Sequence, residues 1–490
     1  METKTIELQR EFDLFINNKW QPAIHGNRYQ RFNPANGELV ASIAKAGPED
    51  ALAAVAAARK AFDHGPWPKL APAERAGVLL KTTQMIEERK EELAVYESLT
   101  SGAPLHQARW MIDWVIDLFY YYAGMARSIA GQTYLFNSEM GFTFKEPVGV
   151  VSQLIPWNFP LNQAVWKICP ALAAGCTVVA KPDIKTPITT LLLAEMFAEA
   201  GLPEGVLNVI TGEPSELSQV LTAHPDIDMV SLTGSTASGK TIMRNAADTV
   251  KRVHLELGGK SPNIVLADAD LDAAARASVS SVFFRSGQIC TAASRVLVQE
   301  EVHDEFLALL EKHADAMKVG DPMDPESVLG PMISAEQLDR VERYVDAGTQ
   351  HGARQVRGGK RLQGGFFDKG FYLAPTIFDQ VNADMSIARE EIFGPVASVL
   401  TFRDPQDALN LANQTIYGLA SGVWTKNINT ALQMSRGLRA GTVWINTYGL
   451  VHVEVPVGGY KMSGYGRELG TQGLDEYLLV KSVHVHLDAL

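Results

Sequence analysis

The sequence predicts an α/β protein built on parallel sheets. Short β-branched runs bounded by Gly or Pro alternate with helical stretches over most of the chain, which is typical of right-handed βαβ units. The length of 490 residues exceeds what one hydrophobic core usually serves, and it indicates two or three domains. Because no repeat or long linker separates independent modules, we expect two α/β domains packed as one unit.

The predicted elements follow one another in a regular order. Residues 48–61 and 72–99 have the N-terminal signals and the apolar spacing of helices. A first series of strand candidates, with a helix at 189–200 among them, spans residues 148–156, 176–182, 205–212 and 229–235. A second series, interrupted by Gly-rich turns at 357–370, spans residues 261–268, 294–300, 395–402 and 441–446. The alternating segment 478–490 predicts an edge strand, which often completes a sheet on another subunit.

The composition is that of a soluble globular protein. Hydrophobic residues make up 46% and charged residues 20%, and the formal net charge of −12 leaves no broad basic surface for nucleic acid or anionic lipid. No apolar run reaches the roughly 18 residues of a membrane span, and the N-terminus lacks the apolar region of a secretory signal. Three cysteines form neither a disulfide framework nor a paired zinc motif. We expect a cytoplasmic protein with no metal site, no nucleic-acid partner and no membrane contact.

The cysteines are the first candidates for chemistry, because a thiolate is the strongest side-chain nucleophile near neutral pH. Cys169 and Cys176 lie in an apolar helix-to-strand passage, where buried structural cysteines are common. Cys290 instead follows Gly, Gln and Ile and precedes Thr, a context that indicates a polar loop facing a ligand. On composition alone a structural role for Cys290 remains open.

Two further residues are candidates for acid–base and oxyanion chemistry. Glu256 lies between two leucines on a strand-like run and precedes a Gly pair, so burial should raise its pKa and suit it to act as a general base. Asn158 lies in the loop PWNFP, where two prolines would hold its amide ready to donate to a developing oxyanion. A buried ion-paired Glu and a turn-forming Asn are the alternatives.

Residues 234–241 (GSTASGKT) match the phosphate-loop pattern G-x4-G-K-[ST] and follow a strand candidate. Taken literally, the pattern predicts a nucleotide triphosphatase, with Lys240 on the phosphates and Thr241 on magnesium. A Gly-rich turn that enters a helix also suits the pyrophosphate of a dinucleotide. The pattern alone leaves both interpretations open.

Six motifs occur in one order between residues 156 and 396, namely PWNFP, VAKP, LTGST, ELGGK, GQIC and EEIFGPV, and GGYKMSGYGRELG follows at 458–470. In this combination the sequence resembles the aldehyde dehydrogenase superfamily over nearly its whole length. In that family the turn at 234–239 holds a dinucleotide pyrophosphate without a magnesium site. The resemblance therefore favours coenzyme binding over the triphosphatase.

The resemblance implies NAD(P)-dependent, non-phosphorylating oxidation of an aldehyde to the carboxylic acid. Cys290 would attack the aldehyde to give a thiohemiacetal and then a thioester. The Asn158 amide and the Cys290 backbone N–H would hold the oxyanion, and Glu256 would activate the hydrolytic water. Glu468 is implied in a second proton route. A non-catalytic relative would have lost the thiol or the base, and acyl-transferring relatives usually lack the equivalent of Glu256, so the residues present favour hydrolysis.

The family architecture implies a Rossmann-like coenzyme domain at residues 1–127 and 146–257. An α/β catalytic domain would span residues 258–462, and a β oligomerisation arm with a C-terminal tail would comprise 128–145 and 463–490. The arm is expected to pair with the C-terminal strand. Burial of that exposed edge makes a homodimer or homotetramer the expected assembly.

Matching positions also imply the residues of the coenzyme site. Lys181 would bind the adenosine ribose, Gly234 and Ser235 the pyrophosphate, and Glu391 and Phe393 the nicotinamide ribose. Other positions that would line the cleft are Ile155, Trp157 and Gly258. Many NAD-preferring members carry a Glu three residues after this Lys, where the present sequence has Ile184. Because that carboxylate is missing, a 2′-phosphate is not repelled there, and the choice between NAD and NADP stays open.

The implied substrate tunnel combines aromatic walls with a wide mouth. Val451 and Val457 occupy positions that often carry Phe in enzymes for small aldehydes, so we expect a medium-sized or aromatic aldehyde. The alternative is a polar or anionic semialdehyde held by residues such as Asn162, Arg285, His452 or Glu454. The full set of implied substrate contacts is Trp114, Phe159, Asn162, Trp166, Ile289, Thr291, Val451 and Val457.

Overall fold

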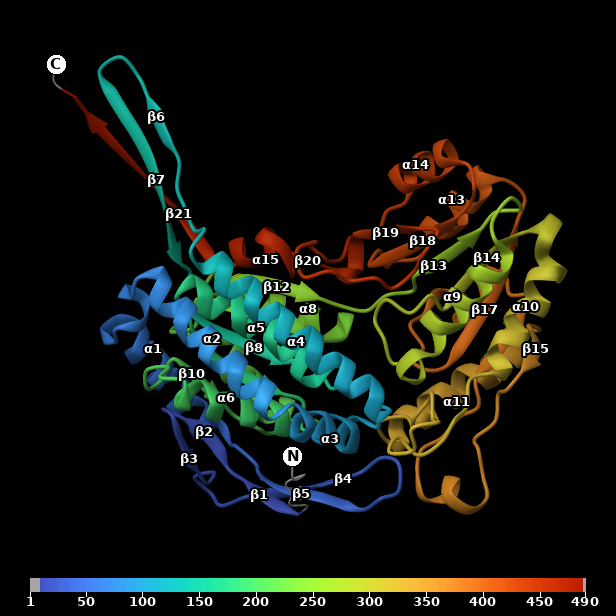
Figure 1. The fold of residues 1–490 in the computed structure, drawn as a ribbon, viewed down its shortest axis with the longest axis horizontal. Coiled ribbons are helices and arrows are strands. Elements are labelled where there is room, and N and C mark those ends of the chain that lie inside the picture. The colour runs from blue at the N-terminus through green and yellow to red at the C-terminus, as the bar shows by residue number, and fades with distance from the viewer. Residues whose placement is uncertain (1–8, 488–490) are drawn as a thin grey trace.

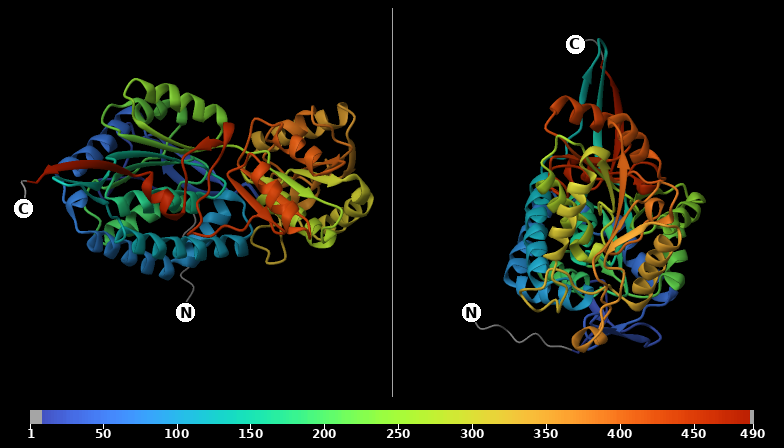
Figure 2. Two further views of the ribbon diagram at one scale, coloured as in Figure 1. Left: turned by 90° about the horizontal axis from the view of Figure 1, so that it is seen from above. Right: turned by 90° about the vertical axis from the view of Figure 1, so that its right-hand side faces the viewer.

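The computed structural model describes residues 9–487 and consists of two bodies, each a sheet flanked by helices, and a narrow arm that projects from one of them (Figure 1). Seen from above, the two bodies lie side by side and the arm points away from the second body (Figure 2). The predicted α/β fold class is confirmed.

The first body is built on an eight-stranded sheet of order β20-β12-β11-β8-β9-β10-β2-β3. Its five central strands are parallel, as the alternation of strands and helices predicts. They are β8 (Val150–Ile155), β9 (Thr177–Pro182), β10 (Leu207–Val209), β11 (Met229–Thr233) and β12 (Arg252–Glu256). Antiparallel strands extend the sheet at both ends, namely β2 (Leu14–Ile16), β3 (Lys19–Gln21) and β20 (Gly464–Tyr465).

Alternate residues of the parallel strands pack under helices on opposite faces, because strand side chains have a period of two. Val151 and Val178 belong to one core with α2 (Pro72–Glu88), α4 (Leu105–Ala126), α5 (Pro160–Ala174) and α6 (Ile188–Glu199). Val150 and Val179 belong to another core with α1 (Pro48–His64), α7 (Pro214–Ala223) and α8 (Thr236–Ala247). The central strands are therefore buried on both faces, which explains their continuous apolar sequence.

The helix predicted at residues 72–99 is wrong in one respect, since it is two helices, α2 and α3 (Lys90–Ser101). Arg89 leaves the helical conformation at φ −104° and ψ 15°. Its guanidinium donates to Glu92 at 2.8 Å and to Glu195 of α6 at 3.3 Å. Because the apolar spacing continues through the break, the sequence pattern could not locate it.

The second body contains a seven-stranded sheet of order β15-β16-β17-β14-β13-β18-β19, parallel except for β15. In chain order the strands are β13 (Pro262–Val265), β14 (Arg295–Gln299), β15 (Arg354–Arg357), β16 (Thr376–Asp379), β17 (Val396–Phe402), β18 (Ala420–Trp424) and β19 (Thr442–Ile445). The helices of this body are α9 (Leu271–Phe283), α10 (His303–Asp315), α11 (Ala335–Gln350), α12 (Ser386–Arg389), α13 (Pro405–Asn413) and α14 (Ile428–Gly437).

The arm is a three-stranded antiparallel sheet that joins distant parts of the chain (Figure 1). Its strands are β6 (Thr133–Leu135), β7 (Glu139–Pro147) and β21 (Leu478–His486), and β21 pairs with β7 over its whole length. The predicted pairing of the arm with the C-terminal strand is thus confirmed, while residues 488–490 of that prediction lie outside the described residues. The short α15 (Gly470–Asp475) precedes β21, and near the N-terminus β1 (Arg10–Phe12), β4 (Arg28–Phe32) and β5 (Leu39–Ala44) form a further small sheet.

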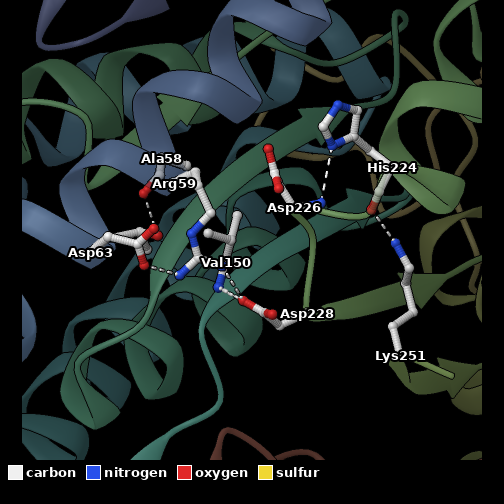
Figure 3. Close-up of polar contacts among 9 residues, drawn as sticks. Ala58, Arg59, Asp63, Val150, His224, Asp226, Asp228 and Lys251 are labelled. Atoms are coloured by element: carbon white, nitrogen blue, oxygen red, sulfur yellow. Dashed lines mark hydrogen bonds and ion pairs between the residues drawn. The ribbon is translucent and has the colours of Figure 1, made fainter. Parts of the chain in front are cut away.

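A polar network ties together the amino ends of the parallel strands (Figure 3). Asp228, directly before β11, accepts hydrogen bonds from Arg59 of α1 at 2.8 Å and from the Val150 backbone N–H at 2.7 Å. Lys251, just before β12, donates to the His224 carbonyl at 2.5 Å. These bonds fix one end of the sheet, whereas the opposite, carboxyl end is where ligands bind in open parallel sheets.

Candidate active site

Most of the predicted catalytic and coenzyme residues of the first body lie at the carboxyl ends of its strands. Ile155 ends β8, and the loop with Asn158 follows it. Gly234 and Ser235 come directly after β11, and Glu256 ends β12. Because parallel strands end at one edge of the sheet, these residues from separate stretches of sequence meet there.

Cys290 lies in a loop of the second body, beyond α9 and a tight turn at Phe284–Gly287. Arg285 and Ser286 adopt left-handed φ angles of 54° and 55°. Gly287 is required in the same turn, because its φ is +72° and a Cβ there would lie 2.1 Å from the Gly394 carbonyl oxygen. The turn thus places the thiol loop tightly against the segment that contains Phe393.

The three cysteines, all in the described part of the chain, differ in exposure as predicted. Cys169 and Cys176 are buried in the core, and Cys290 is partly exposed. Burial and the nearby Glu391 and Glu256 carboxylates raise the pKa of the Cys290 thiol to about 12. Its own backbone N–H opposes this rise in pKa by hydrogen bonding to the sulfur.

The Gly pair after Glu256 is what allows the two bodies to approach at the site. A Cβ on Gly258 would lie 2.4 Å from the Glu391 carboxylate, and a Cβ on Gly259 would lie 2.3 Å from the Cys290 carbonyl oxygen. Glu391 also accepts a hydrogen bond from the Gly259 N–H at 3.0 Å. A larger residue at Gly259 would push the thiol loop away from the end of β12, and one at Gly258 would displace the Glu391 carboxylate.

Glu256 is 7% exposed, in agreement with the predicted burial. Burial and the Glu468 carboxylate raise the pKa of Glu256 well above its usual value, and Lys167 and Arg467 oppose this rise in pKa. Lys167 and Glu468 themselves form a buried ion pair. A carboxylate with a raised pKa takes a proton from water more readily than an ordinary one, which suits a general base.

Asn158 is also 7% exposed and is held on both sides. Its side-chain Nδ2 donates to the Gln288 carbonyl at 3.0 Å, two residues from Cys290. Since an amide nitrogen carries two hydrogens, the second stays available for an oxyanion. The Asn158 carbonyl accepts a hydrogen bond from the Arg285 guanidinium.

Arg285 is predicted as an alternative contact for a polar substrate. In the structure its guanidinium is instead bonded to other groups of the protein. It is 8% exposed and donates to the Ser101 hydroxyl at 3.2 Å as well as to the Asn158 carbonyl. Burial lowers the pKa of Arg285 to about 10, and the buried Glu97 carboxylate opposes this fall in pKa. Its guanidinium lies 4.9 Å from the centre of the Phe159 ring. Arg285 therefore holds the Asn158 loop in place through its hydrogen bond to the Asn158 carbonyl. Only the tertiary contacts show this role.

The turn after β11 is unlike a phosphate loop. Ser235 caps α8 and accepts a hydrogen bond from the Ser238 N–H at 3.1 Å, so the residues between the two glycines are already helical. Lys240 is exposed, and the Thr241 hydroxyl donates to the Ala237 carbonyl at 3.2 Å. The chain cannot wrap around a triphosphate in this conformation, but the free N–H groups at the start of α8 suit a pyrophosphate.

The remaining coenzyme candidates surround the same edge of the sheet. Lys181 in β9 is 6% exposed, and burial lowers its pKa, whereas Asp183 and Glu213 oppose this fall in pKa. Ile184 lies in the turn that follows β9. Trp157 and Phe393 meet edge to face with ring centres 5.3 Å apart. A buried lysine, a helix N-terminus and the Gly258–Glu391 contact together fit a dinucleotide.

Several substrate candidates form an aromatic wall in the first body. Trp114 of α4 and Trp166 of α5 have ring centres 5.4 Å apart, and Trp114 Nε1 donates to the Val451 carbonyl at 3.5 Å. Val451 and Val457 are both partly buried against the same core. Ile289 flanks the thiol. Of the two polar candidates, Asn162 is buried in α5, and the Thr291 carbonyl accepts a hydrogen bond from Tyr448 at 2.8 Å.

Two further aromatic residues, Phe284 and Trp110, belong to this wall and are not among the substrate contacts predicted from the sequence. The rings of Phe284 and Phe159 stack with centres 6.5 Å apart, and Trp110 meets Phe284 edge to face at 6.4 Å. Trp110 is 56% exposed. It precedes Trp114 by four residues on α4, and this spacing on a predicted helix could have shown that the two indoles share a face.

The comparisons with known proteins agree with this geometry. The family model described as "Aldehyde dehydrogenase family" matches residues 20–483. The chain belongs to the aldehyde dehydrogenase family. It is 45% identical over 474 residues to the betaine aldehyde dehydrogenase of Bacillus subtilis, with 96% of each chain covered. It is 44% identical to the mitochondrial benzaldehyde dehydrogenase of Antirrhinum majus, with 96% of this chain and 88% of the relative covered.

Solved structures give the same result. The crystal structure of the NAD-dependent aldehyde dehydrogenase from Sinorhizobium meliloti matches with a TM-score of 0.97 and 45% identity, and the match covers 100% of this chain and 97% of the other. The predicted family and enzyme class are confirmed: the protein is an aldehyde dehydrogenase that uses NAD or NADP. Across residues 9–487, no helix has the length and apolarity needed to cross a bilayer. Within the same range, no group of three or more His, Cys, Asp or Glu is placed to hold a metal ion.

Proposed function

We propose that the enzyme oxidises a medium-sized or aromatic aldehyde to its carboxylic acid, with NAD as the preferred coenzyme. The observation that carries the proposal is the close approach at the Gly258–Gly259 pair. It brings the partly exposed thiol of Cys290 to the end of the strand that carries the buried Glu256 carboxylate.

The steps follow from these groups. The Cys290 thiol passes its proton to solvent water as the sulfur adds to the aldehyde carbon, and the oxyanion of the thiohemiacetal accepts hydrogen bonds from the Asn158 amide and the Cys290 N–H. A bound nicotinamide coenzyme supplies the acceptor for the hydride that leaves this carbon. The thioester that remains on Cys290 is attacked by water as Glu256 takes a proton from it. The C–S bond then breaks, and the acid and the free sulfur are released.

Asn158→Ala should lower the rate of aldehyde oxidation by ~10²–10³, because one donor to the oxyanion is lost. Coenzyme binding should remain, since the predicted coenzyme contacts lie elsewhere. The measurement is kcat with saturating coenzyme and aldehyde, together with a coenzyme titration. An unchanged kcat in a folded variant would show that the Asn158 amide does not contact the oxyanion.

The preference for NAD rests on the charges around Lys181. Both Asp183 and Glu213 lie close enough to raise the pKa of Lys181 against the effect of burial. A 2′-phosphate that approached Lys181 would meet two carboxylates, even though Ile184 supplies no charge of its own. Several related structures contain NAD, which agrees with this balance.

Glu213→Gln should raise kcat/KM for NADP several-fold and change kcat/KM for NAD little, since repulsion of one phosphate is removed. The measurement is kcat/KM for both coenzymes with one aldehyde. Glu216→Gln is a matched control, because it removes a carboxylate three residues further along, in the first turn of α7, where Glu216 pairs with Lys45 outside the predicted ribose contacts. A higher kcat/KM for NADP than for NAD in the unmodified enzyme would contradict the proposed preference.

The substrate class is proposed from the aromatic wall. Trp114, Trp166 and Phe159 offer ring faces for an aromatic aldehyde, and Val451 and Val457 leave space at the mouth. The Antirrhinum majus relative is named for benzaldehyde. An anionic semialdehyde fits this site less well. The Arg285 guanidinium, which could bind its negative charge, is already bonded to Asn158 and Ser101.

A second candidate is an aldehyde with a quaternary ammonium group, as in the name of the Bacillus subtilis relative. Aromatic faces attract such cations. Glu454 is exposed near Tyr121, whose pKa is raised by burial and by that carboxylate. The same wall could therefore hold a cation, with Glu454 providing the attractive charge.

The test is formation of reduced coenzyme by the purified enzyme, with NAD and with NADP, over aromatic, long aliphatic, short aliphatic, quaternary ammonium and anionic aldehydes. We expect the highest kcat/KM for an aromatic or medium-sized aldehyde with NAD. A preference for the quaternary ammonium aldehyde would select the second candidate. A preference for short polar or anionic aldehydes would contradict both.

The assembly, location and domain limits remain proposals. We propose a homodimer or homotetramer in the cytoplasm, supported by the exposed apolar residues Tyr134, Leu135, Phe144 and Val480 on the arm. We also propose a coenzyme domain at 1–127 and 146–257, a catalytic domain at 258–462, and an arm and tail at 128–145 and 463–490. The two large sheets support this division, although β20 of the tail joins the sheet of the coenzyme domain.

A further inference from the structure

A buried histidine lies beside the general base and has no role in the steps above. His254 precedes Glu256 by two residues on β12, so both side chains lie on one face of the strand. His254 is 1% exposed, and its Nε2 lies 3.7 Å from Glu256 Oε1. Among the described residues, neither of these two buried atoms has a hydrogen-bond partner.

Unpaired buried polar atoms are costly, and two complementary ones that face each other form a natural pair. A separation of 3.7 Å is slightly too long for a hydrogen bond and too short for a water molecule between the atoms. A small rotation of the Glu256 side chain would close it. Catalytic hydrogen bonds are often long in free enzymes and shorten when substrate binds.

The other imidazole nitrogen is fixed by the neighbouring strand. β11 and β12 are parallel and place Ser231 opposite His254, with Ser231 Oγ 3.3 Å from Nδ1. When the serine hydroxyl donates to Nδ1, the hydrogen of the neutral ring is on Nε2 and points to Glu256. The same tautomer serves protonated Glu256, because a carboxyl group that carries its proton on one oxygen still accepts a hydrogen bond at the other.

The surroundings keep this ring neutral. Burial, together with the Lys167 and Arg467 charges, lowers the pKa of His254 well below its usual value. The packing is also specific for the ring: Gly466 has a φ of +94°, and a Cβ there would lie 2.2 Å from the His254 ring carbon Cδ2. A glycine at this point on the facing segment makes space for the imidazole.

We propose that His254, together with Ser231, is a positioning residue that holds the Glu256 carboxyl in both of its protonation states during thioester hydrolysis. The inference rests on the proposed role of Glu256 as the general base. His254 touches neither substrate nor coenzyme and acts through the Glu256 carboxylate. Its Nε2–H donates to Glu256 Oε1 both before water attacks and afterwards, when the proton taken from water is on the other carboxyl oxygen and the ring keeps its tautomer.

The pH dependence has a definite direction. The charged groups that affect Glu256 are Glu468 and Arg467 after β20, Lys167 of α5, and Glu476 after α15, and Cys290 lies close enough to be affected by Glu256. None of them changes when His254 is replaced. Loss of a donor to the ionised form favours the protonated form, so the pKa of Glu256 should rise and the acid limb of the hydrolysis rate should move to higher pH.

The test compares His254→Leu with His254→Gln, because glutamine keeps a donor and an acceptor at similar reach and leucine keeps only bulk. For His254→Leu we expect steady-state turnover to fall about tenfold, with an unchanged burst of reduced coenzyme in the first turnover and an acid limb displaced to higher pH. His254→Gln should restore most of the rate and the original acid limb. Ser231→Ala should give a smaller effect in the same direction, and it tests the pair even if His254→Leu fails to fold.

Glu256→Gln, measured in parallel, separates the two proposals. If Glu256→Gln turns over like the unmodified enzyme, the proposed base is wrong and the inference about His254 fails with it. If Glu256→Gln stalls after the burst while the His254 and Ser231 variants keep the normal rate and pH profile, only the inference about His254 is overturned. An equal loss of burst and steady state in His254→Leu and His254→Gln would indicate a purely structural role and would also overturn it.

Discussion

Cys290→Ala should abolish aldehyde oxidation and leave the enzyme folded and able to bind coenzyme. In the proposed mechanism the partly exposed thiol forms the covalent bond to the aldehyde carbon, and alanine offers no nucleophile in its place. The measurement is formation of reduced coenzyme with the best aldehyde, accompanied by a coenzyme titration. Retained turnover would contradict the assignment of Cys290.

Cys169→Ala is the matched control, because Cys169 is fully buried in the core of the first body and should leave the activity in place. Thiol labelling gives a second check. Burial and the Glu391 and Glu256 carboxylates raise the pKa of Cys290 to about 12, so its labelling rate without coenzyme should rise with pH throughout the neutral and alkaline range. Labelling that is fast and independent of pH above neutrality would contradict this environment.

Glu256→Gln should stop the reaction at the thioester. The first turnover should still give one equivalent of reduced coenzyme per active site, and the steady-state rate should then fall by ~10²–10⁴, the usual contribution of a general base. The measurement is a rapid-mixing burst followed by the steady state, with mass spectrometry of the intact protein to detect the acyl group on Cys290. A steady-state rate close to that of the unmodified enzyme would show that another group activates the water.

The pH profile of the unmodified enzyme provides the matching observation. Burial and Glu468 raise the pKa of Glu256, and this proposed base would work only when ionised. The hydrolysis rate should therefore be low at acidic pH and rise as pH increases through the raised pKa. In Glu256→Gln this limb should be absent, because the amide does not titrate. A limb of the same midpoint in both proteins would assign it to a different group.

The fold could be predicted from the sequence, and three catalytic candidates could be proposed from it, for physical reasons. The apolar runs of β8, β9 and β11 mark buried parallel strands because helices cover both faces, so little polar sequence interrupts them. The prolines of the PWNFP loop and the Gly pair after Glu256 indicate unusual backbone conformations. Both signals involve only a few neighbouring residues. A local pattern could not predict the break between α2 and α3, because Arg89 leaves the helix to reach Glu195, which lies 106 residues away in the sequence.

By itself the sequence predicted the α/β class and, through its ordered motifs, the family, and it made Cys290, Glu256 and Asn158 the candidates for chemistry, because each depends on side-chain chemistry or on nearby residues. Only the tertiary structure decided that Arg285 supports the Asn158 loop, that Trp110 and Phe284 extend the aromatic wall, and that His254 faces Glu256. These contacts join different strands, helices and bodies, or depend on which side chains are buried together. The pKa shifts at these contacts come from burial, and the spacing of residues along the chain does not reveal burial.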